Sequence, residues 1–171
     1  MNEHQLIVTY HESHNSSELH SHDYPLLAFI HQGCQILSTD KHSLLSMPGS
    51  LIYIPAGVPH CADFLKQSQI SLLRLPLTSI PDLTEICMLD VSPIVTQLFR
   101  FWESGGPEPK LEPHYIHVLI DQCICCKAAN NPLIAKGGMD RRLLPVIDAL
   151  SNEPSIKSVS YTHLRAHETH E

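Results

Sequence analysis

Short apolar segments separated by turn residues dominate the first half of the chain. Each segment has the length of a β-strand, and successive segments begin at roughly ten-residue intervals. Gly and Pro lie between them, as in M-P-G-S and P-A-G-V-P, where they suit turns and strand ends. The pattern predicts an all-β sandwich or barrel over residues 1–84. The predicted strands are 5–10, 25–32, 34–40, 42–47, 50–56 and 69–77.

From residue 85 onward the apolar residues recur at helical spacing instead. Ser92 is suited to cap a helix and Pro93 to occupy its first position, which predicts a first helix from there. A second helix is predicted over 114–128. The region 85–130 is therefore predicted to be a helical pair. The apolar stripe of its second helix consists of Ile116, Leu119, Ile120, Cys123 and Cys126.

The remaining chain is predicted to hold a linker and the start of a third helix. Residues 131–139 form the linker, and the helix begins in 140–158, with an apolar face of Leu143, Leu144, Ile147 and Leu150. The predicted fold class is thus mainly β, a jelly-roll barrel followed by a helical pair and the beginning of a third helix.

Composition narrows the class of protein. The 171 residues are 43% hydrophobic and 17% charged, which is typical of one globular domain with room for a fragment of a second. A net charge of −7 makes the chain a poor non-specific partner for nucleic acid. No long apolar run predicts a membrane span, and no export signal stands at the N-terminus. We therefore expect a cytoplasmic protein whose six cysteines are reduced.

Three histidines are the strongest candidates for a functional site. His20 and His22 are two residues apart, so on an extended segment their side chains point to the same side. His60 follows the turn-forming run that begins at Pro55. Three neutral imidazoles can bind zinc, iron, nickel or copper. Equally, they can line a pocket and hydrogen-bond an organic ligand, and the sequence leaves both alternatives open.

The spacing of these histidines resembles that of the cupin fold, in which an H-x-H segment meets a histidine from a P-x-G-x-x-H turn. Metal-binding cupins usually add a carboxylate four or five residues after H-x-H, where this chain has Leu26 and Leu27. The nearby Glu18 and Asp23 are poor substitutes by register. The resemblance implies a cavity that binds a small molecule, with or without a transition metal ion. The matching residues are His20, Ser21, His22, Pro48, Gly49, Pro55, Gly57 and His60, with Tyr24, Leu26 and Tyr53 as further candidate pocket residues.

The helical half resembles the AraC-type transcription regulators that carry an N-terminal cupin sensor. The segment TEICMLDVSPIVTQLFRFW and a later D-x-R-L…L…P pattern carry this resemblance. It implies a small-molecule effector, a homodimer formed through the helical pair, and DNA binding only through a downstream half. The residues assigned to dimerisation are Ile116, Ile120 and Cys123, in a stripe expected to pack against the barrel or a second subunit. Those matching the later pattern are Asp140, Arg142, Leu143, Leu150 and Pro154.

The last residues read as translated DNA of technical origin. A reverse translation of SYTHLRAHET matches the read-through of a transposon sequencing adapter. We therefore expect residues 159–171 to be artefactual and the natural sequence to be interrupted before its helix-turn-helix motifs. The histidines of this segment are left out of the candidate ligands.

The sequence favours a non-enzymatic sensor. An amphipathic segment after the helical pair, M-D-R-R-L-L-P-V-I-D-A-L, suits a regulator better than a stand-alone enzyme. Two alternatives stay open. One is a small three-histidine cupin enzyme, a dioxygenase or isomerase, with iron held by His20, His22 and His60. The other is a metal-free binding module without a regulatory role.

Overall fold

The computed structural model describes residues 5–77, 79–80, 82–130, 134–136, 145–146 and 149. The chain divides into two compact units, 1–139 and 140–171, and every described strand belongs to the first unit. Of the expected third helix, Pro145, Val146 and Ala149 are helical and exposed. The rest of 140–158 and the expected artefactual tail 159–171 lie outside the described residues, as does most of the linker 131–139.

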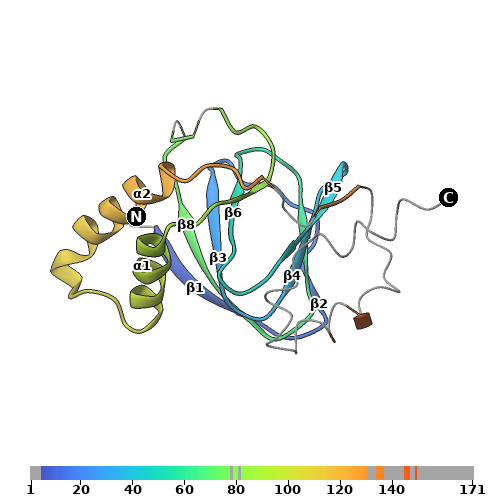
Figure 1. Cartoon of the computed structure of the whole chain (residues 1–171), viewed down its shortest axis with the longest axis horizontal. Coiled ribbons are helices and arrows are strands. Elements are labelled where there is room, and N and C mark those ends of the chain that lie inside the picture. Colours follow the sequence, from blue (N-terminus) through green and yellow to red (C-terminus); the bar gives the residue numbers. More distant parts are fainter. Residues whose placement is uncertain are drawn as a thin grey trace. The chain divides into compact units, whose positions relative to one another are not determined.

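Two five-stranded antiparallel sheets form the body of the first unit (Figure 1). The first sheet has the order β1-β8-β3-β6-β9, and the second has the order β10-β5-β4-β7-β2. The prediction of a mainly β fold is confirmed, and each predicted strand overlaps an observed one. The strands are β1 (Leu6–His11), β2 (Asn15–Ser16), β3 (Leu26–Gln32), β4 (Gln35–Ser38), β5 (His42–Ser46), β6 (Leu51–Ile54), β7 (Cys61–Phe64), β8 (Ser68–Arg74), β9 (Cys87–Leu89) and β10 (Ile134–Lys136).

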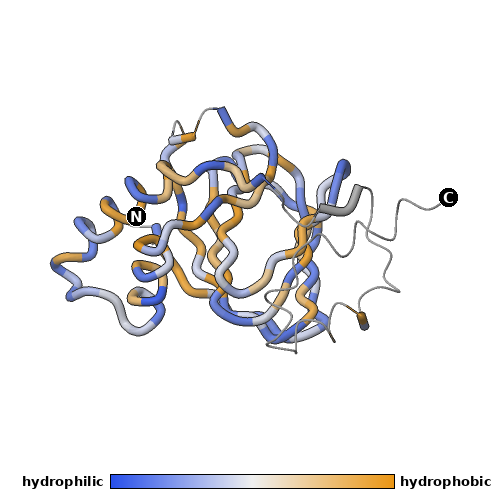
Figure 2. Tube along the Cα trace, in the orientation of Figure 1, coloured by the Kyte–Doolittle hydropathy of each residue, from blue (hydrophilic) through white to orange (hydrophobic). Residues whose placement is uncertain are grey.

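The first sheet is apolar on both of its faces, which explains the continuous hydrophobic runs in its central strands (Figure 2). On β3, Leu26, Ala28 and Ile30 face the second sheet, while Leu27 and Phe29 face the opposite way. Side chains alternate along a strand, so burial on both sides requires apolar residues at every position. The structure therefore has an inner cluster between the sheets and an outer cluster under the helices.

The helical pair covers the outer face of the first sheet (Figure 1). It consists of α1 (Pro93–Glu103), the short 3₁₀ helix η1 (Pro109–Leu111) and α2 (Glu112–Ile124). As predicted, Ser92 caps α1, its hydroxyl accepting a hydrogen bond from the Val95 amide at 3.4 Å. Phe99 of α1 stacks on Phe29 of β3 with ring centroids 4.7 Å apart. Neither helix has the length and apolar character needed to cross a bilayer, as far as the described residues go.

The apolar stripe of α2 packs against the barrel of its own chain. Ile116 is 7% exposed and Cys123 is fully buried, both in the outer cluster, and Ile120 is packed against that cluster. Residues already buried within one chain are not available to a second subunit. The assignment of Ile116 and Cys123 to a dimer contact therefore needs correction, because the barrel occupies their side chains. A dimer on this helical pair would have to use its exposed residues.

The chain after α2 returns to the sheets. Ala128 forms an isolated bridge with Leu89 of β9, supported by hydrogen bonds from the Asp90 amide to the Lys127 carbonyl and from the Ala129 amide to the Met88 carbonyl, both 2.8 Å. β10 then pairs with β5 at the edge of the second sheet. Residues 127–129 are thus hydrogen-bonded beside β9 of the first sheet, and residues 134–136 to β5 of the second.

Gly33 joins β3 of the first sheet to β4 of the second, and it has no space for a side chain. Its φ is +88°, in the region that favours glycine. A Cβ built there would overlap the Ser68 Oγ and lie 2.5 Å from the Gln67 carbonyl oxygen. Gly57 also has a positive φ, +77°, but nothing lies within 4 Å of its hypothetical Cβ. Both glycines therefore have a backbone conformation that favours glycine, but only Gly33 is also closely packed.

His31 gives the fold a pH dependence. Its Nε2 lies 2.7 Å from the Ser71 hydroxyl, and burial lowers the pKa of its imidazole, with Glu103 raising it and Arg100 lowering it further. The unfolded chain then binds the proton more readily, so folding becomes less favourable as pH falls below about 6.5. We expect the drop in melting temperature between pH 7.5 and pH 5 to be smaller in His31→Gln than in the wild type. His114→Gln, at an exposed histidine, is the control and should show the same drop in melting temperature as the wild type. An equal drop in His31→Gln and the wild type would refute the role of His31.

Candidate functional site

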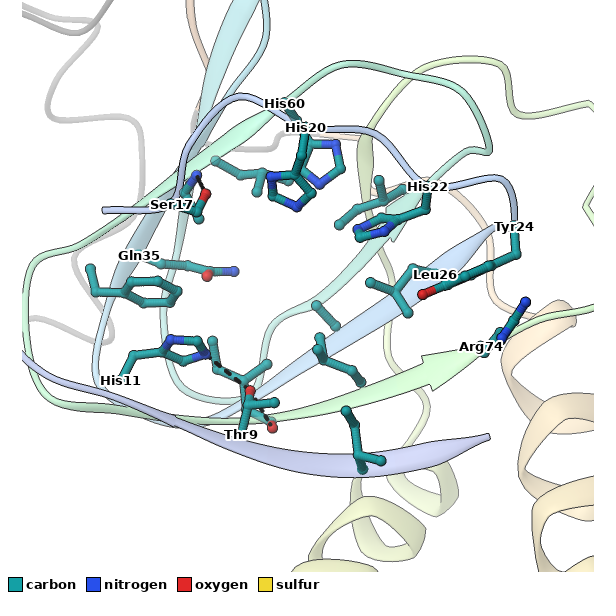
Figure 3. Close-up of a pocket in the computed structure, with 18 of the residues that line it drawn as sticks. Thr9, His11, Ser17, His20, His22, Tyr24, Leu26, Gln35, His60 and Arg74 are labelled. Atoms are coloured by element: carbon teal, nitrogen blue, oxygen red, sulfur yellow. Dashed lines mark hydrogen bonds between the residues drawn. The ribbon is translucent and has the colours of Figure 1, made fainter. Parts of the chain in front are cut away.

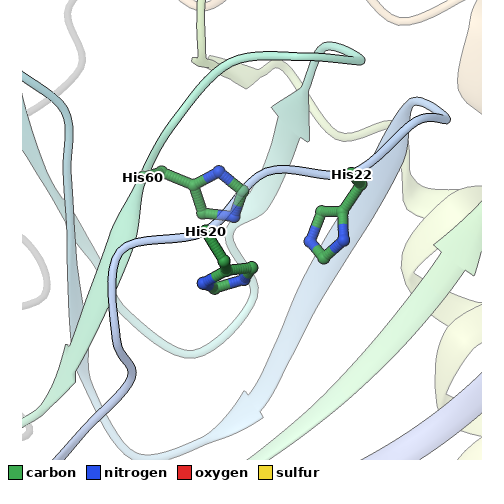
Figure 4. A group of neighbouring side chains, drawn as sticks. All are labelled: His20, His22 and His60. Atoms are coloured by element: carbon green, nitrogen blue, oxygen red, sulfur yellow. The ribbon is translucent and has the colours of Figure 1, made fainter.

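His20, His22 and His60 meet at one end of the barrel (Figure 4). The first two lie on an extended segment between β2 and β3, and the third directly precedes β7. His20 and His60 exchange two backbone hydrogen bonds of 3.0 and 2.9 Å, and the Gly57 amide donates to the His22 carbonyl at 2.7 Å. Backbone pairing therefore fixes the positions of the three side chains relative to one another.

Backbone carbonyls also fix which ring nitrogen carries the proton. The Nδ1 of His20 lies 2.7 Å from the Glu18 carbonyl, and the Nδ1 of His60 lies 2.8 Å from the Val58 carbonyl. A carbonyl can only accept, so each Nδ1 is the protonated nitrogen and each Nε2 keeps its lone pair. One ligand nitrogen from each of the three histidines lies within 4.8 Å of the others. This is the arrangement that orients histidines toward a metal ion.

Around His22 and His60 the surroundings favour the neutral imidazole. Burial lowers the pKa of His60, opposed by its hydrogen bond to Val58 and reinforced by His20 and His22. Burial and the neighbouring His20 lower the pKa of His22, while Asp23 raises it. Metal ions bind the neutral form of histidine. The three residues therefore fit a divalent transition ion, which their imidazole nitrogens would hold.

A cavity of about 550 Å³ extends from these histidines between the two sheets (Figure 3). That volume lies within the range of small-molecule sites, roughly 300–1,000 Å³. Much of the wall is aliphatic and comes from the inner faces of β3, β4, β6 and β8. The aliphatic residues include Leu26, Ala28, Leu37, Ile54, Ile70 and Leu72.

Polar groups occupy two further places on the cavity wall (Figure 3). Tyr24 and Arg74 lie together, with the guanidinium carbon 3.7 Å from the centre of the Tyr24 ring. Thr9, His11 and Gln35 lie on the side away from the three histidines, on β1 and β4. The cavity thus combines an aliphatic wall with polar groups at separate points, as ligand sites usually do.

The candidate pocket residues fall in different places. Tyr24 and Leu26 line the cavity. Tyr53 does not: it belongs to the outer cluster, because its neighbours Ile52 and Ile54 take the inner face of β6. The assignment of Tyr53 to the pocket is therefore wrong. Asp23 lies at the cavity wall but is not one of the side chains gathered with the three histidines.

His11, Gln35 and Arg74 are cavity residues that were not predicted from the sequence. The signal was present for His11, since Ile7, Thr9 and His11 alternate along β1 and share a face. For Gln35 and Arg74 no local pattern marks the side chain as functional. Their positions depend on how β4 and β8 pair with strands distant in the sequence.

The cysteines form no second site. Burial raises the pKa of the Cys123 thiol, and likewise those of Cys126 and Cys87, which disfavours the reactive thiolate. Within the described ranges, the three histidines are the one group of potential metal ligands brought together.

Comparisons with known proteins support the fold assignment. No protein-family model matches the chain, and neither does any curated protein. Among solved structures, the AraC-like transcriptional activator CuxR matches over 90% of this chain and 64% of its own, with a TM-score of 0.57 and 13% identity. This chain therefore spans less than two thirds of CuxR. The fold is a cupin-like β-barrel followed by a helical pair. The match with the AraC-like protein covers residues of both parts.

Two other solved structures match less than half of this chain. A protein of unknown function from Streptococcus pyogenes, SPY1581, matches 41% of this chain and 61% of its own, with 21% identity and a TM-score of 0.39. A cupin-2 domain protein from Shewanella frigidimarina matches 42% of this chain and 70% of its own, with 20% identity and a TM-score of 0.38.

Proposed function

We propose that this chain is the effector-sensing and dimerisation part of an AraC-type transcription regulator. A small molecule occupies the cavity between the sheets, with or without a metal ion at the three histidines. DNA binding belongs to a part of the protein other than the barrel and the helical pair. The observation that carries the proposal is the match with CuxR, which spans both barrel and helices. The cavity supplies the place where an effector would bind.

An effector can act only if it binds two states of the protein with different affinities. To test this, the full chain is fused to a DNA-binding half-domain that represses its operator only as a dimer. The fusion should repress a reporter, and members of a small-molecule library should change that repression. Ala28→Leu, which fills part of the cavity, should abolish the response while keeping the repression. A fusion that never represses, or a response that Ala28→Leu leaves intact, would contradict the proposal.

The three histidines favour one alternative, a metal-dependent enzyme. Three protein ligands with open positions are the usual arrangement at catalytic metal centres. The two functions differ in what happens to the bound molecule. A library member that binds the metal-loaded protein should be recovered unchanged after long incubation if the chain is a sensor. Its conversion to a product, lost in His60→Ala, would favour the enzyme.

The exposed side of the helical pair is the surface that we propose for the homodimer. Ile94 and Phe101 of α1 are 50% and 48% exposed, and Val118 of α2 is 46% exposed. Tyr115 connects the two helices, since its hydroxyl donates to the Leu98 carbonyl and its ring contacts Phe101 with centroids 5.8 Å apart. A symmetric dimer would bury this patch on both chains.

Phe101→Glu should convert a dimer of this kind to a monomer. The substitution puts a charge in an apolar contact without touching the buried stripe of α2, so the fold should persist. Sedimentation at tens of micromolar protein gives the mass, and unchanged circular dichroism gives the fold. Leu77→Glu, at a residue 69% exposed beyond β8, is the matched control and should leave the dimer intact. A monomeric wild-type chain would rule out dimerisation through this surface.

A further inference from the structure

Gln35 is a buried amide side chain on the cavity wall. The residue is only 3% exposed, and its amide is directed into the cavity (Figure 3). Among the residues that the structure describes, no hydrogen-bond partner is found for this amide. Buried polar groups are nearly always hydrogen-bonded, so an unmatched amide facing a cavity indicates a ligand or the water that a ligand replaces.

A second unmatched polar group lies beside the first. Ser46 of β5 is the direct cross-strand partner of Gln35, and opposed residues of antiparallel strands share a face. Its side chain is fully buried, and its Oγ has no hydrogen-bond partner within the described ranges. Gln35 and Ser46 are thus two neighbouring polar side chains with no hydrogen-bond partner among the described residues.

His11, another residue of the cavity wall, contributes a lone pair. Its ring stacks on Phe64 with centroids 3.9 Å apart, and Phe64 is the cross-strand partner of Gln35. The Thr9 hydroxyl donates to the Ile70 carbonyl, so at 3.0 Å it must accept from the Nε2 of His11. The Nδ1 of His11 is therefore unprotonated, and no partner for it is found in the described part of the chain.

These groups define what a ligand must offer. The Nδ1 of His11 requires a hydrogen-bond donor, and the amide nitrogen of Gln35 requires an acceptor. A hydroxyl group provides both on one oxygen. A carboxylate would place its own lone pairs against that of His11. The remaining wall nearby is aliphatic, which suits an apolar ligand body.

We propose that Gln35 and His11 form a selective subsite, on the side of the cavity away from the three histidines, for the hydroxyl group of an uncharged alcohol or phenol with an apolar body. The proposal rests on the proposed function, since it names the class of effector that the cavity binds. A ligand without the hydroxyl strips water from the Gln35 amide and replaces it with nothing. Sites built to bind a hydroxyl reject analogues that lack it.

The test compares three probes of nearly equal shape: p-cresol, p-xylene and p-toluate. Their dissociation constants are measured by titrating the full chain labelled with ¹⁵N at glutamine and following the side-chain amide signals. The Gln35 signal is the one absent from Gln35→Leu. We expect p-cresol to bind about tenfold more tightly than p-xylene, because an unpaired buried amide is costly. The Gln35 signal should move with p-cresol.

Substitutions then show which residues cause the preference for p-cresol over p-xylene. Gln35→Leu and His11→Phe should each reduce it to within about twofold, consistent with loss of one hydrogen bond. Gln32→Leu, at an exposed glutamine at the end of β3, should keep it. If p-toluate binds as tightly as p-cresol, or if p-cresol leaves the Gln35 signal of the wild type unmoved, the proposal is wrong. Equal binding of p-cresol and p-xylene would overturn the subsite but leave a cavity sensor standing. Binding of none of the probes would count against both.

Discussion

Replacing His60 by alanine will remove most of the transition metal that the purified protein carries. His60 is 2% exposed, and its Nε2 lone pair is directed by the bond between its Nδ1 and the Val58 carbonyl. The wild type should hold about one equivalent of metal, since three histidines form one site. The cluster consists of three histidines and contains no carboxylate. The loss of one imidazole therefore leaves only two protein ligands for the metal. Elemental analysis of protein expressed with ample transition metal measures the content.

His114→Ala is the control for that experiment, because His114 is an exposed histidine on α2. Its metal content should equal that of the wild type. The melting temperature of His60→Ala in the presence of chelator should match that of the chelated wild type, which separates metal loss from unfolding. Background metal in the wild type would eliminate the metal site and leave the cavity as an organic ligand site alone.

Gly33→Ala will destabilise the protein far more than Gly57→Ala. Both glycines have positive φ, so both substitutions carry the same backbone cost of about 1–2 kcal/mol. Only at Gly33 does the new Cβ overlap the Ser68 Oγ and the Gln67 carbonyl. Overpacking of this kind adds roughly 1–3 kcal/mol. We expect a loss of about 2–5 kcal/mol for Gly33→Ala, which is a large share of a typical domain's 5–15 kcal/mol.

Urea unfolding of the two variants side by side checks this difference. The slope against urea should be the same in both, so that the midpoints report stability. The double variant Gly33→Ala with Ser68→Gly removes the overlap with the Ser68 Oγ. It keeps the close contacts with the Gln67 carbonyl oxygen and the Ser68 Cα, at 2.5 and 2.7 Å, and should recover only part of the loss. Equal midpoints for Gly33→Ala and Gly57→Ala would show that the connection between the sheets adapts to a side chain.

The predictable part of the fold is the part with long apolar runs. β3 and β8 each have seven residues, most of them buried or partly buried, and both strands were predicted nearly in full. β7 was missed because Cys61–Phe64 is a short run that includes Asp63, and β2 has only two residues. Such strands exist because a neighbouring strand offers hydrogen bonds, which no local pattern reveals.

The site divides in the same way. His20, His22 and His60 could be found because turn residues and a two-residue spacing lie close to them in the sequence. Tyr53 was misplaced because the direction of a strand side chain depends on register, and a shift of one residue reverses it. Gln35 can be recognised as a candidate binding residue only from its neighbours Phe64 and Ser46, which lie on the two adjacent strands. Sequence spacing cannot supply these cross-strand relations.

The pairing of β10 with β5 connects the chain after the helical pair to the cavity wall. β4 contributes Gln35 and Leu37 to the cavity wall, β5 pairs with β4, and β10 pairs with β5. Two strand spacings amount to about 10 Å, bridged throughout by backbone hydrogen bonds. A displacement of β4 by a bound molecule therefore reaches β10 as movement of one continuous sheet. Residues 134–136 are thus tied, through β5, to the strand that carries Gln35 and Leu37.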